Sequence, residues 1–163
     1  MKHSKKITLV GPYGVGKSSL FRRFIDNSFS EDYQSTIGVQ IKKKVITLDN
    51  GIEISLILWD TEGEMNINDS KQSYLMGSHT FVYIFDLTRI DTFSQINTQL
   101  DFLTNNFPKI PVKVVGNKID SVFKTKVKKT LEEHKINYDI LTSAKTGEHV
   151  EELFAEIARE LSN

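Results

Sequence analysis

A glycine-rich octapeptide with the sequence GPYGVGKS, residues 11–18, fits the pattern G-x-x-x-x-G-K-[ST] in full. Its glycines let successive backbone N–H groups turn inward around phosphate oxygens, and the helix that follows adds its positive dipole end. In such a loop Lys17 would bridge β- and γ-phosphates, and the Ser18 hydroxyl would coordinate Mg²⁺. An apolar strand precedes the octapeptide and a helix follows it, which favours a phosphate-binding loop over a glycine-rich turn. We predict nucleotide contacts from Tyr13, Gly14, Val15, Gly16, Lys17, Ser18 and Ser19.

The tetrapeptide Asn117-Lys118-Ile119-Asp120 predicts which base the nucleotide carries. A carboxylate only accepts hydrogen bonds, so Asp120 can pair with N1–H and the exocyclic amine of guanine. Adenine has an acceptor at N1 and no amine at C2, and a site built on polar pairing rejects such a mismatch by about 10⁴ or more. We therefore predict GTP or GDP as the ligand. A P-loop kinase or ATPase is a weak alternative, because Asn117, Lys118 and Asp120 would have no role in it.

Apolar runs alternate with segments of helical period, which indicates an α/β fold. We expect strands over 7–10, 39–48, 52–59, 81–85, 110–115 and 137–141, and helices from residue 17, over 93–107 and over 150–161. Asp49-Asn50-Gly51 separates two of the strands and predicts a tight antiparallel hairpin. The expected fold is a doubly wound, mainly parallel six-stranded sheet with that hairpin at one edge, forming a single domain over residues 1–163.

Composition excludes several functional classes. The 163 residues include 21 basic and 21 acidic side chains, so net charge gives no support for binding nucleic acid. The absence of cysteine excludes disulfides, thiol chemistry, prenylation and palmitoylation of this chain, and Lys2 excludes N-myristoylation. No apolar stretch is long enough for a signal peptide or a membrane span. We expect a cytoplasmic monomer, held at membranes, if at all, by a tail absent here or by a partner.

Together the motifs make the chain resemble the Ras-like small GTPases, most nearly the Rab branch, over nearly its full length. The Rab resemblance rests on Ile37-Gly38-Val39-Gln40-Ile41-Lys42, Leu58-Trp59-Asp60-Thr61 and Tyr83-Ile84-Phe85-Asp86-Leu87-Thr88. It implies a P-loop small G domain in which Ser143, Ala144 and Lys145 close over the guanine. It further implies that Lys118 packs along the base, that Phe29 covers its edge, and that Tyr33 belongs to the nucleotide site.

The resemblance also implies a GTP-dependent switch with Mg²⁺. Thr36 would give Mg²⁺ a second hydroxyl ligand and its backbone N–H to the γ-phosphate, and Asp60 would hold the ion through water, so the expected metal set is Ser18, Thr36 and Asp60. Gly63 would donate its backbone N–H to the γ-phosphate. The expected partners are effectors, exchange factors and activators that contact residues 30–45 and 61–78, in vesicle traffic or signalling.

Two departures from the family pattern affect the expected catalytic set of Lys17, Thr36, Gly63 and Glu64. The family's second switch reads Asp-Thr-Ala-Gly-Gln-Glu, whereas this chain has Asp60-Thr61-Glu62-Gly63-Glu64-Met65. Glu64 replaces the glutamine that orients the attacking water, and an ionised glutamate offers no donor for developing negative charge. Tyr13 replaces a small P-loop residue and should obstruct a partner's arginine finger. We therefore expect slow hydrolysis; the alternative is a partner-binding module that stays bound to GTP.

Overall fold

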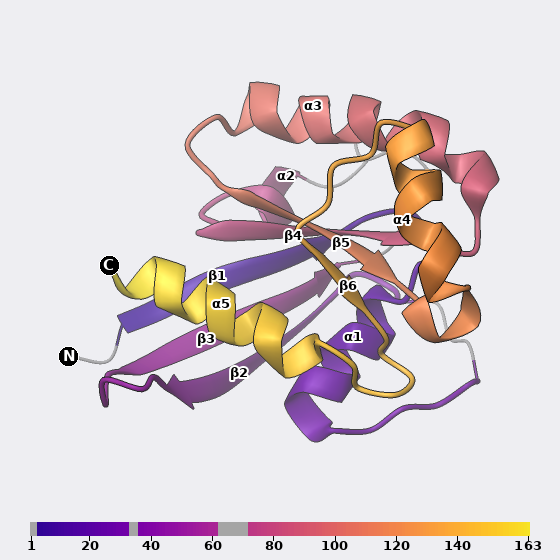
Figure 1. Ribbon diagram of the computed structural model, residues 1–163. Helices are drawn as coiled ribbons and strands as arrows, with labels where there is room; N and C mark the ends of the chain where they lie inside the picture. Colours follow the sequence, from indigo (N-terminus) through magenta and orange to yellow (C-terminus); the bar gives the residue numbers. More distant parts are fainter. Residues whose placement is uncertain (1–2, 33–35, 62–71) are drawn as a thin grey trace.

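The computed structural model describes residues 3–32, 36–61 and 72–163. Its core is a six-stranded sheet with the strand order β2-β3-β1-β4-β5-β6 (Figure 1). The strands are β1 His3–Val10, β2 Val39–Thr47, β3 Glu53–Thr61, β4 Thr80–Asp86, β5 Val112–Asn117 and β6 Ile140–Thr142. The helices are α1 Lys17–Asp26, α2 Gln72–Leu75, α3 Ile96–Asn106, α4 Lys124–Glu133 and α5 Val150–Ser162, with 3-10 turns η2 Ile90–Gln95 and η3 Ile119–Ser121.

The pairing of the strands confirms the predicted doubly wound fold. Strand β1 lies parallel to both β3 and β4, and β5 and β6 continue the parallel arrangement. Strand β2 pairs antiparallel with β3 at the sheet edge, from Val39 opposite Thr61 to Thr47 opposite Glu53. The connecting turn is closed by the Leu48 N–H, which donates to the Ile52 carbonyl at 2.9 Å. The prediction of one antiparallel hairpin at the edge of a mainly parallel sheet is therefore confirmed.

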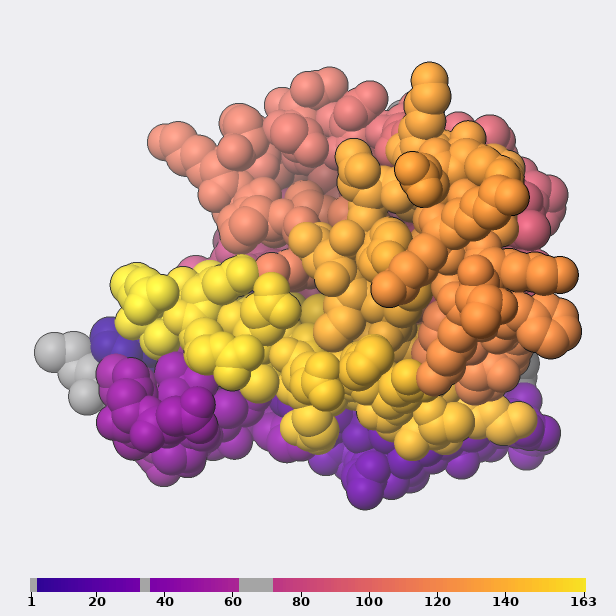
Figure 2. All heavy atoms as spheres, viewed as in Figure 1, coloured from indigo at the N-terminus to yellow at the C-terminus, as the bar shows by residue number. Residues whose placement is uncertain are grey.

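Two apolar layers hold the helices against the sheet. Helices α1 and α5 cover one face, where the rings of Phe24 and Phe154 stack with centroids 4.0 Å apart. Helices α3 and α4 cover the opposite face, where Phe93 contacts Phe85 edge to face at 5.6 Å (Figure 1). In the space-filling view the segments of α4 and α5, orange and yellow, cover much of the visible face (Figure 2).

Several element boundaries differ from those predicted. Strand β1 begins at His3 rather than residue 7, because the polar residues before Ile7 pair with β3 from Ile54 onward. Strand β6 begins at Ile140 rather than residue 137, because Asp139 instead caps β5: its Oδ2 accepts the Val114 N–H at 2.7 Å. The helix expected over 93–107 is divided into the 3-10 turn η2 and the helix α3.

The parallel strands carry their carboxyl ends to the same edge of the sheet, and this is where both predicted motifs lie. The P-loop follows β1, and Asn117 ends β5. In an open α/β sheet, ligands bind outside this edge. Within the described part of the chain, no helix combines the length and the apolar character that a membrane crossing requires.

Candidate nucleotide-binding site

A pocket of about 330 Å³ lies at the carboxyl edge of the sheet, and both predicted motifs contribute to it. Its lining comprises Tyr13, Gly14, Gly16, Lys17, Ser18, Ser19, Arg22, Phe29, Ser30, Glu31, Asp32, Thr36, Thr61, Asn117, Lys118, Asp120, Ser121, Ala144 and Lys145. These residues come from the P-loop, helix α1, the segment after it, and the loops that follow β5 and β6. Segments far apart in the sequence thus meet around one cavity.

The P-loop needs glycine at two crowded positions. Gly11 has φ 145°, and a Cβ there would collide with the Ile84 carbonyl oxygen of β4. Gly16 has φ 100°, and a Cβ there would collide with Nδ2 of Asn117. The backbone therefore packs directly against the sheet and against the base motif. Lys17 is 6% exposed, and its Nζ donates to the carbonyls of Gly11 and Pro12 at 2.7 and 2.9 Å.

The three predicted metal residues lie in one hydrogen-bonded chain. Ser18 Oγ donates to Asp60 Oδ2 at 2.6 Å and lies 2.6 Å from Thr36 Oγ1. Either hydroxyl of the Ser18–Thr36 pair can be the donor, and a hydrogen bond from Thr36 also acts on the Asp60 carboxylate. Burial raises the pKa of Asp60, against the opposing effects of the Ser18 hydrogen bond and the Lys17 and Arg22 charges. Its Oδ1 is buried and has no hydrogen-bond partner within the described residues.

This donor set suits a hard cation. Mg²⁺ prefers oxygen ligands and is usually held by few protein groups alongside phosphates and water. Two hydroxyls and a buried carboxylate with an unpartnered oxygen match that preference, and the ion would supply positive charge facing the phosphates. The described residues contain no cluster of His, Cys, Asp and Glu of the kind that binds a metal through protein ligands alone.

Asn117 joins the two ends of the pocket. Its Nδ2 donates to the Val15 carbonyl at 3.0 Å, and its Oδ1 accepts from Thr142 Oγ1 and from the Ala144 N–H, both at 3.2 Å. The side chain is 2% exposed, so these bonds are made away from water. One amide thereby fixes the P-loop, the end of β6 and the loop that follows it.

Asp120 is held with its carboxylate at the pocket. Its Oδ1 accepts from Ser143 Oγ at 2.6 Å, and its Oδ2 accepts from Ser121 Oγ at 3.0 Å. Burial by itself would raise the pKa of Asp120, but the hydrogen bonds from Ser143 and Ser121, a backbone hydrogen bond and the charge of Lys145 together hold the pKa below its usual value. The group is therefore an ionised acceptor at neutral pH. Each carboxylate oxygen has a second lone pair that the serines do not use, and these lone pairs can accept hydrogen bonds from a nucleotide base.

Ion pairs hold the two lysines at the base end. Lys118 lines the pocket, and its Nζ lies 2.8 Å from Asp86 Oδ2 and donates to the Gly14 carbonyl at 3.1 Å. Lys145 Nζ lies 3.0 Å from Glu31 Oε1. That pair is exposed and connects the loop after β6 with the segment after α1.

Most predicted nucleotide contacts lie on the pocket wall, including Phe29, Thr36 and Lys145. Val15, Asp60 and Ser143 instead lie behind the wall, where they hold Asn117, Ser18 and Asp120 respectively. Tyr33, Gly63 and Glu64, together with Glu62, lie outside the described residues. The nucleotide and catalytic roles assigned to all these residues stay predictions.

Sequence reasoning missed several residues at the pocket. Arg22, Ser30, Glu31, Asp32, Thr61 and Ser121 belong to the lining and were not predicted. The helical spacing of four between Ser18 and Arg22 would have identified the latter as a neighbour of the phosphate end. No sequence signal would have identified Arg89, whose Nη1 donates to the Tyr13 carbonyl at 3.1 Å across 76 residues.

The fold and this pocket define a P-loop small G domain. A model of the Ras family matches residues 6–163. The "Ras-related protein Rab-1" of Theileria annulata and that of Theileria parva are each 38% identical to this chain over 168 positions, covering 97% of it and 74% of each relative. The chain belongs to the Ras family of small GTPases, and the two relatives confirm its resemblance to the Rab branch.

Proposed function

We propose that this protein is a guanine-nucleotide switch, one G domain that binds GTP or GDP with Mg²⁺ and hydrolyses GTP slowly. The observation that carries the proposal is the joining of the P-loop to the base motif around one pocket. Asn117 makes that connection by bonding both Val15 and Ala144. A nucleotide spans the same two ends, with its phosphates at the start of α1 and its base at Asp120.

Mg²⁺ binding gives a direct test of the phosphate end. We expect Ser18→Ala to raise the Mg²⁺ concentration needed for half-maximal retention of GDP by about tenfold or more, because it removes one ligand. Retention of a fluorescent GDP derivative during a Mg²⁺ titration measures this. Ser18→Thr keeps the hydroxyl and is the matched control, and we expect it to stay within about twofold of the natural protein. An equal loss in both variants would contradict a metal-ligand role.

Slow hydrolysis is proposed from the residue types at positions 64 and 13. Glu64 lacks the amide donor of glutamine, and the phosphates would repel its charge. Tyr13 lies on the pocket wall, which supports obstruction of an arginine supplied by a partner, whereas its 44% exposure also fits the alternative that the ring points outward and leaves such an arginine free to enter. An arginine finger together with an ordered glutamine is worth about 10³–10⁵ in rate.

The decisive experiment is single-turnover hydrolysis of preloaded GTP with Mg²⁺. We expect Glu64→Gln to hydrolyse at least about tenfold faster than the natural protein, because the amide regains both an acceptor for water and a donor for developing charge. Glu64→Ala is the control for loss of charge alone, and it should gain less. Fast hydrolysis by the natural protein, with no gain from Glu64→Gln, would show that Glu64 is a working base and would overturn the slow-switch proposal.

The second candidate is a partner-binding module that stays bound to GTP. Glu62, Glu64 and Tyr13 favour it, whereas the Ser18, Thr36 and Asp60 chain favours a switch that senses triphosphate. The same single-turnover experiment separates the two, since the module would show no measurable turnover in the natural protein. By family resemblance we further propose effector and regulator contacts through residues 30–45 and 61–78, in vesicle traffic or signalling at membranes.

A further inference from the structure

One positively charged side chain of the pocket has no part in the recognised motifs. Arg22 lies on α1 and belongs to the pocket lining. Its Nε is buried and has no hydrogen-bond partner in the part of the chain that the structure describes. Burying a guanidinium N–H without a partner is costly, so a side chain in this position invites an acceptor from a ligand.

The helix directs Arg22 towards the phosphate end. Ser18 and Arg22 are four residues apart on α1 and therefore lie on the same face, one turn from each other. Side chains on a helix lean towards its N-terminus, so the long Arg22 side chain runs back to the level of Ser18. The charge of Arg22 also acts on the carboxylate of Asp60, which Ser18 contacts directly.

The neighbouring cations of the pocket differ from Arg22 in being held by this chain. Arg23, the next residue of α1, donates to the carbonyls of Ala144 and Lys145 at 2.8 and 2.6 Å. Lys118 pairs with Asp86, and Lys145 pairs with Glu31. Beside Lys17 of the P-loop, Arg22 is thus a second positive charge at the phosphate end, and its buried Nε has no acceptor among the described residues.

We propose that Arg22 is a specificity-determining residue that favours nucleotides carrying more phosphates, because it holds a fixed positive charge beside the outer phosphate oxygens. This proposal rests on the guanine-nucleotide function proposed above. Each added phosphate brings about one more negative charge, so the attraction to Arg22 grows from GMP through GDP to GTP while the base contacts stay constant. Because part of the side chain is exposed, solvent and salt weaken the attraction.

The test compares the dissociation constants of GMP, GDP and a β,γ-imido analogue of GTP, measured with Mg²⁺ by isothermal titration. For Arg22→Gln we expect the preference for the analogue over GDP to fall about three- to tenfold. The preference of this variant for GDP over GMP should fall as well. Arg22→Lys keeps the charge and should retain most of both preferences, while Arg22→Met keeps the apolar stem and should match Arg22→Gln.

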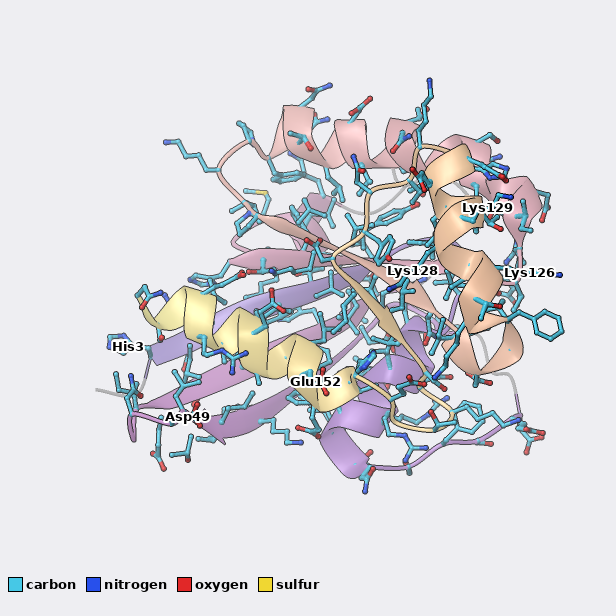
Figure 3. The ribbon with its side chains drawn as sticks, viewed as in Figure 1. His3, Asp49, Lys126, Lys128, Lys129 and Glu152 are labelled. Carbon is cyan, nitrogen blue, oxygen red and sulfur yellow. The ribbon has the colours of Figure 1, made fainter. Side chains whose placement is uncertain are left out.

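A matched control removes one positive charge elsewhere. Lys128 is an exposed residue of α4 outside the pocket lining (Figure 3), and Lys128→Gln should leave all three dissociation constants unchanged. Equal weakening of all three nucleotides by Arg22→Gln and Arg22→Met would mean that Arg22 only supports the fold, and would overturn the proposal. Unchanged preferences would overturn it as well. If the natural protein bound none of the three, the proposed function itself would fall, and this inference with it.

Discussion

Replacing Asp120 by asparagine is expected to weaken GDP binding by about 10²–10⁴-fold, because hydrogen bonds to a charged acceptor contribute about 1.5–3 kcal/mol each, and of the two to guanine one is replaced by two opposed donors and the other loses its charged acceptor. The amide of asparagine presents one acceptor and one donor. Xanthine offers the matching N1–H donor and C2 carbonyl acceptor, so the variant should bind XDP more tightly than GDP. Isothermal titration of both nucleotides against both proteins measures the change.

The control for this substitution is Asp101→Asn, which makes the same chemical change on the exposed surface of α3. It should leave the dissociation constants of GDP and XDP as they are in the natural protein. If Asp120→Asn retained its affinity for GDP, the base would have to be recognised elsewhere, and the assignment of guanine to this end of the pocket would be wrong.

The second large effect is expected on stability. Asn117→Ala removes an amide that satisfies the Val15 carbonyl and the Ala144 N–H in a buried setting. Each buried polar group left without a partner costs about 1–3 kcal/mol, so with two such groups the free energy of unfolding should fall by about 2–6 kcal/mol. Urea unfolding of the nucleotide-free protein measures this loss without the stabilisation that a bound ligand adds.

Thr142→Val provides the comparison for Asn117→Ala. It keeps the shape of a buried side chain and removes only the 3.2 Å bond to Asn117 Oδ1, which can still accept from Ala144. We expect a loss of about 0.5–1.5 kcal/mol from this control. Similar losses from the two variants would show that Asn117 does not join the two ends of the pocket as described.

Local patterns predicted the phosphate and base motifs because each is a continuous segment with its own chemistry. Lys17 and Ser18 are identified by the glycines before them, and Asp120 by the tetrapeptide that it ends. The sheet was predictable for a similar reason, since uninterrupted apolar runs indicate strands covered on both faces. The start of β6 was mispredicted because Asp139 is used by tertiary structure, where it caps the neighbouring strand.

Contacts between distant segments were not predictable from one sequence. The bond from Arg23 to Ala144 joins residues 121 positions apart, and neither residue type indicates the other. For Arg22 the spacing of four places it on the same helix face as Ser18, but an arginine on a helix is ordinarily a solvated residue, so spacing alone does not show that it lines the pocket. Only the packing of α1 beside the P-loop and β3 shows that one of these adjacent arginines lines the pocket while the other holds the loop of Ala144 and Lys145.

The bonds made by Arg23 have a consequence for nucleotide release. Helix α1 begins with Lys17 and Ser18, the predicted phosphate contacts, and near its other end Arg23 holds the loop of Ala144 and Lys145. A force that shifts this helix is therefore transmitted to both halves of the ligand at once. If the proposed nucleotide site is correct, release of the phosphates and release of the base are expected to be cooperative, because displacing α1 disturbs both ends of the pocket.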